Sequence, residues 1–339
     1  MIDEYTKKIK LHKRPHVVIL GAGASRAATP EGEKHGLTLP LMSELPEAIE
    51  LNSILDKKDY LASKNDFEAY FNKLVREGNS ELQKEIEGRL YSFFDAIKIV
   101  DQVTLYDRLV LSLRRKDVIA TFNWDPLLPY AYRRNGHLKN LPPLLFLHGN
   151  VRLGLCEEHS MLGWNDDRCI HCGSSLSPTK LIFPVSDKDY TSNPVISEAW
   201  SHLDWYLGNA YFLTIFGYSA PITDVEARKR IVKRIGSNSM KNLMQLEIVD
   251  IHAEVLLNGN LKGIVDGLHF GSSTTIDHSW LKMHPRLSCE ALWEATMMQH
   301  PIKSIELPRT GILNELQEWV AEFDTFFPKF NDEGPEWMG

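Results

Sequence analysis

The chain has 339 residues, 43% hydrophobic and 24% charged, with a formal net charge of −7. These values describe a soluble globular protein, large enough for one large domain with attachments. The negative charge disfavours nucleic-acid binding by the whole surface, so no direct nucleic-acid partner is expected. No run of about 18 apolar residues and no charged-then-apolar leader is found, so neither a membrane span nor secretion is expected. Four cysteines, three of them clustered, fit a reducing cytoplasm better than a disulfide framework.

The first predicted element is the apolar strand of the stretch VVILGAGASRAA, residues 17–28. Gly21 and Gly23 would let the backbone turn sharply, and a helix starting there would aim amide groups at a phosphate. A tight turn after a buried strand explains a lone GxG about as well. Arg26 stands where a redox dinucleotide fold would have its third glycine, and no strand ending in Asp or Glu follows. A bound nucleotide is therefore compatible with this turn, but a redox fold is disfavoured.

Helical spacing dominates residues 41–115, which are too long for one crossover helix. We expect this insertion to form a helical subdomain over the ligand crevice. The next strand, 117–123, ends in TFNWD. Asp125 before a proline suits a helix start, but Asn123 is a polar amide at the mouth of an apolar strand, where it could hold a water or a ligand hydroxyl.

The following strand, 144–150, ends in LHGN. A lone histidine is more often a capping or core residue than a catalyst. His148 lies at the carboxyl end of a strand and precedes a glycine, and this placement favours a general base that faces the same crevice as Asn123.

Residues 152–180 are rich in Cys, His, Gly, Ser and Asp and carry little apolar periodicity. Cys156 and His159 form a CxxH pair, and Cys169 and Cys172 form a CxxC pair, a pattern typical of tetrahedral zinc. Chance clustering of thiols is the alternative, and His171 could compete with His159 as the fourth ligand. Four protein ligands would close the ion to substrate, so the site would be structural.

Three more strands are predicted at 181–185, 211–217 and 246–251. After the second of these, Gly217 and Ser219 put a small residue and a hydroxyl where they could contact phosphate or ribose, while Asp224 resembles a helix cap. In the terminal stretch 311–330, Leu313, Leu316, Val320 and Phe323 share a helical face, which favours docking on the chain's own domain over an oligomer contact. Alternating strands and helices predict the α/β class, with a doubly wound parallel sheet.

Taken together, GAGAS at 21–25, TFNWD at 121–125, LHGN at 147–150, the zinc module and GYS at 217–219 resemble the sirtuin family, over roughly 15–255. This resemblance implies a sirtuin-like Rossmann fold with NAD bound at the GAG loop. It implies catalytic roles for Asn123, in the nicotinamide-ribose pocket, and for His148 as the base. The residues expected to line the cofactor site are Gly21, Ala22, Gly23, Ser25, Thr121, Asp125, Gly217 and Ser219.

The departures from protein-deacylase sirtuins are as informative as the matches. The loop after GAG lacks the short GIPDFR stretch, and LIFPVSDKDY stands where a peptide-pairing FGE strand would be. TFNWD and LPLMSEL look more like the sirtuin-like NAD hydrolases of bacterial antiphage defence, which assemble with themselves or with a partner protein. The expected activity is therefore hydrolysis of NAD to nicotinamide and ADP-ribose, restrained until assembly or a trigger. The alternatives are a deacylase or ADP-ribosyltransferase, and a non-catalytic NAD or ADP-ribose sensor.

This interpretation divides the chain into three parts. The NAD-binding domain would comprise residues 1–151 and 181–285, the zinc module 152–180, and a C-terminal helical extension 286–339. The helical face at 313–323 and the insertion at 41–115 are the features that could make activity depend on assembly.

Overall fold

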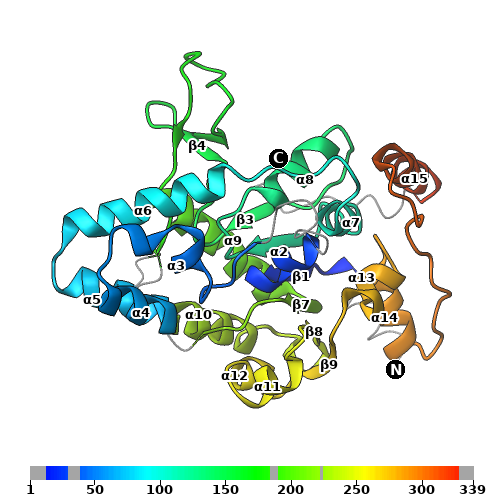
Figure 1. Ribbon diagram of the computed structural model, residues 1–339. Helices are drawn as coiled ribbons and strands as arrows, with labels where there is room; N and C mark the ends of the chain where they lie inside the picture. The colour runs from blue at the N-terminus through cyan, green and yellow to red at the C-terminus, as the bar shows by residue number, and fades with distance from the viewer. Residues whose placement is uncertain (1–12, 30–38, 184–189, 222–223, 328–339) are drawn as a thin grey trace.

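The computed structural model describes residues 13–29, 39–183, 190–221 and 224–327 (Figure 1). Its centre is a six-stranded parallel sheet with the strand order β3-β2-β1-β7-β8-β9. The strands are β1 (His16–Leu20), β2 (Val118–Thr121), β3 (Leu144–Phe146), β7 (Phe212–Phe216), β8 (Gln245–Val249) and β9 (His269–Ser273). The chain therefore builds the sheet outward from β1 in one direction and then, from β7, in the other.

Both faces of the sheet are buried, which is why its central strands are largely apolar, with His16, Thr214 and Glu247 as buried polar exceptions. Along β1, Val18 and Leu20 belong to the core on one face, and Val17 and Ile19 to the core on the other. Helices cover each face, so the predicted α/β doubly wound parallel sheet is confirmed.

The core that contains Val18 and Leu20 is completed by residues from helices on the first face. These helices are α2 (Ala22–Ala28), α3 (Leu45–Ala48), α5 (Phe67–Arg76), α6 (Ser80–Asp95), α7 (Leu105–Leu111), α8 (Leu127–Asn135) and α15 (Leu313–Phe326). On the second face lie α9 (Pro194–Asn209), α10 (Val225–Gly236), α11 (Ala253–Asn258) and α12 (Lys262–Val265). Helices α13 (Trp280–Met283) and α14 (Ser288–Thr296) follow the last strand.

The segment 41–115 is helical, as its spacing predicts, and also contains α4 (Lys57–Asn65). Asp66 and Asn79 cap α5 and α6 by accepting hydrogen bonds from backbone amides three residues on. The apolar residues Phe71 and Leu90 join the same core as Val18 of the central strand. These helices therefore share one core with the sheet.

Two strand predictions need correction. Residues 181–183 of the strand predicted at 181–185 are not in a strand, and 184–185 lie outside the described residues. The amide of Ile182 donates to the carbonyl of His148, and its carbonyl accepts from the Trp124 indole, so this segment bonds to two loops and not to a ladder. The missed strand is β9, whose sequence HFGSS is exposed at the sheet edge and carries no apolar run.

A small antiparallel sheet, of order β5-β4-β6, stands apart from the main one and projects at the top of Figure 1. Its strands are β4 (Leu153–Cys156), β5 (Met161–Trp164) and β6 (Ser177–Pro178).

Helix α15 lies against α7, and Leu316, Val320 and Phe323 are buried there. The docking of this helical face on its own chain is confirmed, so these side chains are not available for a subunit contact. Among the described residues, no helix is long and apolar enough to cross a bilayer.

Candidate functional site

The functional residues predicted from the sequence gather where the strand ends of the parallel sheet meet. Thr121 of β2 pairs in register with Phe146 of β3, and Asn123 and His148 each follow two residues later. Leu20 of β1 pairs in the same way with Phe216 of β7, which sets the two glycine turns beside each other. The strand order β3-β2-β1-β7-β8-β9 places the topological switch point of the sheet between the parallel strands β1 and β7. Open α/β sheets bind ligands at such a point.

The glycines of the first turn are required by a close approach of two backbones. Gly217 has a φ of 61°, and the amide of Gly23 donates to its carbonyl at 3.0 Å. A Cβ atom on Gly21 would lie 2.5 Å from the same carbonyl oxygen. The small residues of the first turn thus allow its backbone to lie directly against the turn at Gly217. Ala22 is the exposed residue at the start of α2.

Asn123 is anchored by its side-chain amide group. Its Nδ2 donates to the carbonyl of Gly21 and to Oγ of Ser25, both at 2.8 Å. Because a carbonyl can only accept, the nitrogen must face Gly21, and the orientation of the amide is fixed. The side-chain oxygen Oδ1 is then the atom of Asn123 that can accept a hydrogen bond from a ligand hydroxyl.

Ser25 connects Asn123 to a buried carboxylate. Its hydroxyl donates to Oδ2 of Asp125 at 2.6 Å, so it must accept from Asn123 and from the Tyr106 hydroxyl, which lies 2.6 Å away. Burial raises the pKa of Asp125. Burial, followed by the charge of Asp125, also raises the pKa of Tyr106, which therefore stays a neutral donor.

Asp125 lies just before α8, whose N-cap is Pro126 and not Asp125 as the sequence predicts, but its carboxylate still bonds to the start of the helix. Its Oδ1 accepts from the amide of Leu127, the first residue of α8. Thr121 is buried, and its hydroxyl accepts from the amide of Asn123, so it shapes the turn that presents the amide. Ser219 is exposed, beyond the end of β7.

His148 lies in an aromatic and acidic surrounding. Its Nε2 is 2.9 Å from the Tyr190 hydroxyl and 3.4 Å from Oδ2 of Asp224. Tyr190 in turn donates to Oδ1 of Asp224 at 2.7 Å. The Phe122 ring meets the imidazole edge-on, with centroids 4.8 Å apart, and stacks on Tyr218.

The residues after His148 hold this loop in place. Gly149 has a φ of 76°, and a Cβ atom there would lie 2.5 Å from the carbonyl oxygen of Lys180. The side-chain nitrogen Nδ2 of Asn150 donates to the backbone carbonyls of Asn123 and Asp125. The LHGN and TFNWD turns are thus tied directly to each other.

Sequence reasoning missed Tyr106 and Tyr190, and it explained Asp224 only as a helix cap. Asp224 does stand at the N-cap of α10, but its side chain makes no capping hydrogen bond. It accepts from Tyr190, which packs against it from a different part of the chain. Single tyrosines form no recognisable sequence motif, so Tyr106 and Tyr190 could not be predicted. For Asp224, the sequence shows only that it follows the end of a predicted strand.

A hollow of about 540 Å³ opens at the carboxyl ends of β8 and β9. It is lined by polar side chains that include His252, Glu254, Ser273 and His278. This hollow lies along the same sheet edge as the turns described above, on the far side of β7.

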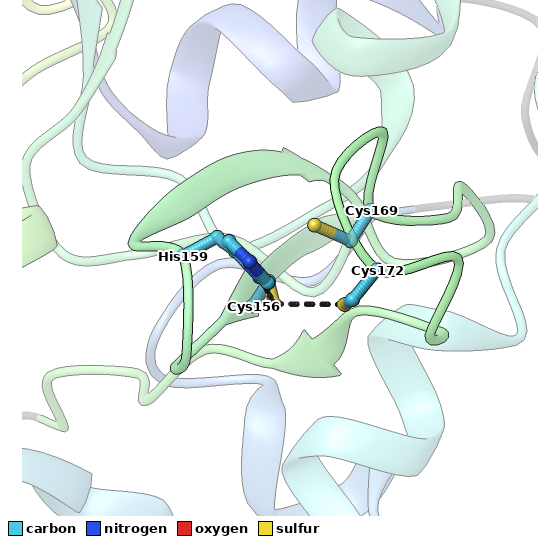
Figure 2. A group of neighbouring side chains, drawn as sticks. All are labelled: Cys156, His159, Cys169 and Cys172. Atoms are coloured by element: carbon cyan, nitrogen blue, oxygen red, sulfur yellow. Dashed lines mark hydrogen bonds between the residues drawn. The ribbon is translucent and has the colours of Figure 1, made fainter.

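The four predicted metal ligands converge in the small antiparallel module (Figure 2). The ligand atoms of Cys156, His159, Cys169 and Cys172 all lie within 4.8 Å of one another. Sγ of Cys156 is 3.6 Å from Nδ1 of His159 and 3.8 Å from Sγ of Cys172. A tetrahedral zinc ion with ordinary bond lengths separates two sulfurs by about 3.8 Å, and sulfur from nitrogen by about 3.6 Å.

The Cys₃His cluster is therefore consistent with structural zinc. Hydrogen bonds from Ser174 lower the pKa of Cys172 to about 6, which favours the thiolate form that metals bind. His171 stacks on the ring of His159 but is not part of the cluster.

No protein-family model matches the chain. No curated protein matches it either. Among solved structures, it is similar to a Sir2 protein in complex with an inhibitor, 2′-O-acetyl-ADP-ribose and a deacetylated p53 peptide, at 17% identity and a TM-score of 0.37, covering 74% of this chain and 86% of that one. It is also similar to a Sir2 homologue in complex with NAD, at 12% identity and a TM-score of 0.35, covering 94% of each chain.

Proposed function

We propose that the protein hydrolyses NAD at the nicotinamide–ribose bond, giving nicotinamide and ADP-ribose. The observation that carries this proposal is the position of Asn123 and His148 on neighbouring strand ends, beside the switch point of the sheet. The diphosphate would meet α2 at the exposed Ala22 and would be favoured there by the helix dipole. Ser219 and the hollow beyond β8 would receive the adenosine half.

For this reaction the protein needs only to orient the substrate and the attacking water and to stabilise the charge that develops. Cleavage of the glycosidic bond builds positive charge on the ribose, as in glycoside hydrolysis. Oδ1 of Asn123 would accept from a ribose hydroxyl or from the attacking water, and His148 would take up the proton that is released. Nicotinamide leaves as a neutral molecule, so no general acid is required.

The buried carboxylates fit this charge balance. Asp125 sits behind Ser25 and Asn123, and Asp224 sits behind His148. Negative charge held near a developing cation lowers the barrier, provided that it is fixed in advance. The zinc that the Cys₃His cluster would hold serves the fold of the module, because four protein ligands leave no position for substrate.

Deacylation and ADP-ribosyl transfer to a protein are the competing activities. In the sequence, LIFPVSDKDY replaces the strand that would hold an acyl-lysine, although 184–189 lie outside the described residues. Because this sequence lacks the FGE pattern of a peptide-pairing strand, water is the expected acceptor. A role as an effector in antiphage defence, kept low until the chain assembles with itself or with a partner, follows from the resemblance and from the harm of unrestrained NAD loss.

The test is to supply NAD as the only substrate and to quantify nicotinamide and ADP-ribose, then to add an acetyl-lysine peptide. We expect equal amounts of both products and no deacetylated peptide. Products that appear only with the peptide would establish a deacylase, and NAD binding without turnover would establish a sensor. Repeating the assay across protein concentrations tests whether activity depends on assembly.

A further inference from the structure

His148, Tyr190 and Asp224 form a chain of three polar groups, and the reaction outlined above gives no role to the Tyr190 hydroxyl at its centre. The Tyr190 hydroxyl stands between Nε2 of His148, at 2.9 Å, and Oδ1 of Asp224, at 2.7 Å. Oδ2 of the same carboxylate lies 3.4 Å from Nε2. All three side chains are buried, at 8% exposure or less.

The direction of these hydrogen bonds follows from counting protons. Tyrosine has one hydroxyl proton, and Tyr190 donates it to the Asp224 carboxylate. Its oxygen can then only accept from His148, so Nε2 must carry a proton. In a neutral imidazole the other nitrogen, Nδ1, is then the unprotonated one.

Burial and the nearby Asp224 raise the pKa of Tyr190 far above its ordinary value, so the hydroxyl keeps its proton throughout the range in which enzymes work. The surrounding packing holds the three groups in line. The Tyr190 ring packs on Trp200 on one side, and the rings of Tyr190 and His148 are nearly parallel, at 12°.

We propose that Tyr190 and Asp224 are positioning residues that fix the tautomer of His148, so that Nδ1 is the atom that accepts the proton during NAD cleavage. Asp224 would also stabilise the imidazolium that forms when Nδ1 takes up a proton. The proton passes from the ribose hydroxyl or water to Nδ1, and Nε2 keeps its own proton throughout. This inference rests on the proposed function only for its kinetic consequence.

The tautomer can be read without substrate, from long-range ¹H–¹⁵N correlations of histidine-labelled protein. Of the 13 histidines, His148 is identified by the signals that His148→Asn removes. At about pH 8, above the usual histidine pKa, we expect a protonated Nε2 and a bare Nδ1. A proton on Nδ1 with a bare Nε2, or a doubly protonated ring, would overturn the proposal.

Asp224→Asn supplies the kinetic arm. An amide can donate to the tyrosine oxygen and turn its proton toward His148, so the proton of the imidazole should move to Nδ1. We expect kcat for NAD cleavage to fall about 10²- to 10⁴-fold, as when the aspartate behind a catalytic histidine is neutralised, with KM within about 3-fold. Tyr190→Phe should cost less, because Asp224 still faces Nε2.

Glu247→Gln is the matched control, since it neutralises another buried carboxylate, one held by Thr214 and Ser279 instead. It should leave the His148 signals unchanged. Loss of kcat with an unchanged tautomer in Asp224→Asn would contradict the proposal. If the wild-type protein shows no NAD cleavage at all, the proposed function fails, while the spectrum of wild-type protein still decides the tautomer.

Discussion

At the scale of single residues, the buried histidine of β1 has the clearest physical consequence. His16 is completely buried, with Nδ1 2.8 Å from Oγ of Ser288 and Nε2 2.8 Å from Oγ1 of Thr214. These contacts tie the first strand to α14 and to β7. Burial lowers the pKa of His16 to about 3, against an ordinary value of 6.5.

The sign of the pH effect follows from this shift. Between pH 6.5 and about 3 the unfolded chain binds a proton at His16 and the folded chain does not. Stability is therefore lost as pH falls through this window, with a limiting slope of about 1.4 kcal/mol per pH unit. In urea titrations at about pH 7 and pH 5, we expect the free energy of unfolding to fall more steeply for wild type than for His16→Gln. Equal slopes would show that His16 titrates normally.

Some residues of the candidate site can be predicted from the sequence and others cannot. Asn123 is predictable as a site residue because a polar amide is unusual at the end of an apolar strand, and in the structure its side chain makes three polar contacts. Its partner Tyr106 could not be identified, because a buried tyrosine in a helix looks like any other core residue. The glycines were predictable as a turn, but their contact with Gly217 was not, since it depends on the order of the strands.

At the scale of elements, the antiparallel module has almost no core of its own. Its buried cluster comprises Cys156, Cys169 and Leu176, with Met161 packed against them. Two of these three buried residues are predicted metal ligands. We therefore predict that the module needs a bound metal ion to fold, because the free energy of binding is also free energy of folding.

Two neighbouring histidines make this testable. We expect wild type and His171→Ala to contain one zinc ion per chain and His159→Ala to contain much less, by elemental analysis after dialysis. In His159→Ala, amide exchange should speed up in β4 and β5 and stay slow in β1 and β7, which belong to separate cores. Equal zinc content in the two variants would mean that the ligand set is wrong.

The strands also differ in how well they can be predicted from their sequences. β1, β2, β7 and β8 are predictable because strands buried on both faces are mostly apolar. β9 was not, because an exposed edge strand has no such pattern. The segment predicted as a strand at 181–185 has the right composition, yet among its described residues Ile182 bonds to the loops that carry His148 and Trp124, and these tertiary contacts decide its conformation.

At the scale of the whole molecule, one sheet organises everything that bears on function. The helices of 41–115 and the C-terminal α15 both join the core on one face, while α9 and α10 close the other. Asp324 of α15 pairs with the buried Arg286, so the C-terminal helix is fastened to the chain that carries it. Assembly, if it controls activity, must therefore use surfaces other than the apolar face of α15.

In the proposed reaction, water attacks the ribose of NAD at a site formed by Asn123 and His148. Its most direct test is to run the reaction in ¹⁸O-labelled water and to weigh the products by mass spectrometry. We expect free nicotinamide and ADP-ribose carrying one ¹⁸O atom from wild type, with turnover lowered at least about 10²-fold in Asn123→Ala and His148→Ala. Intact NAD with wild type, ADP-ribose without the label, or near-native turnover in both folded variants would contradict it.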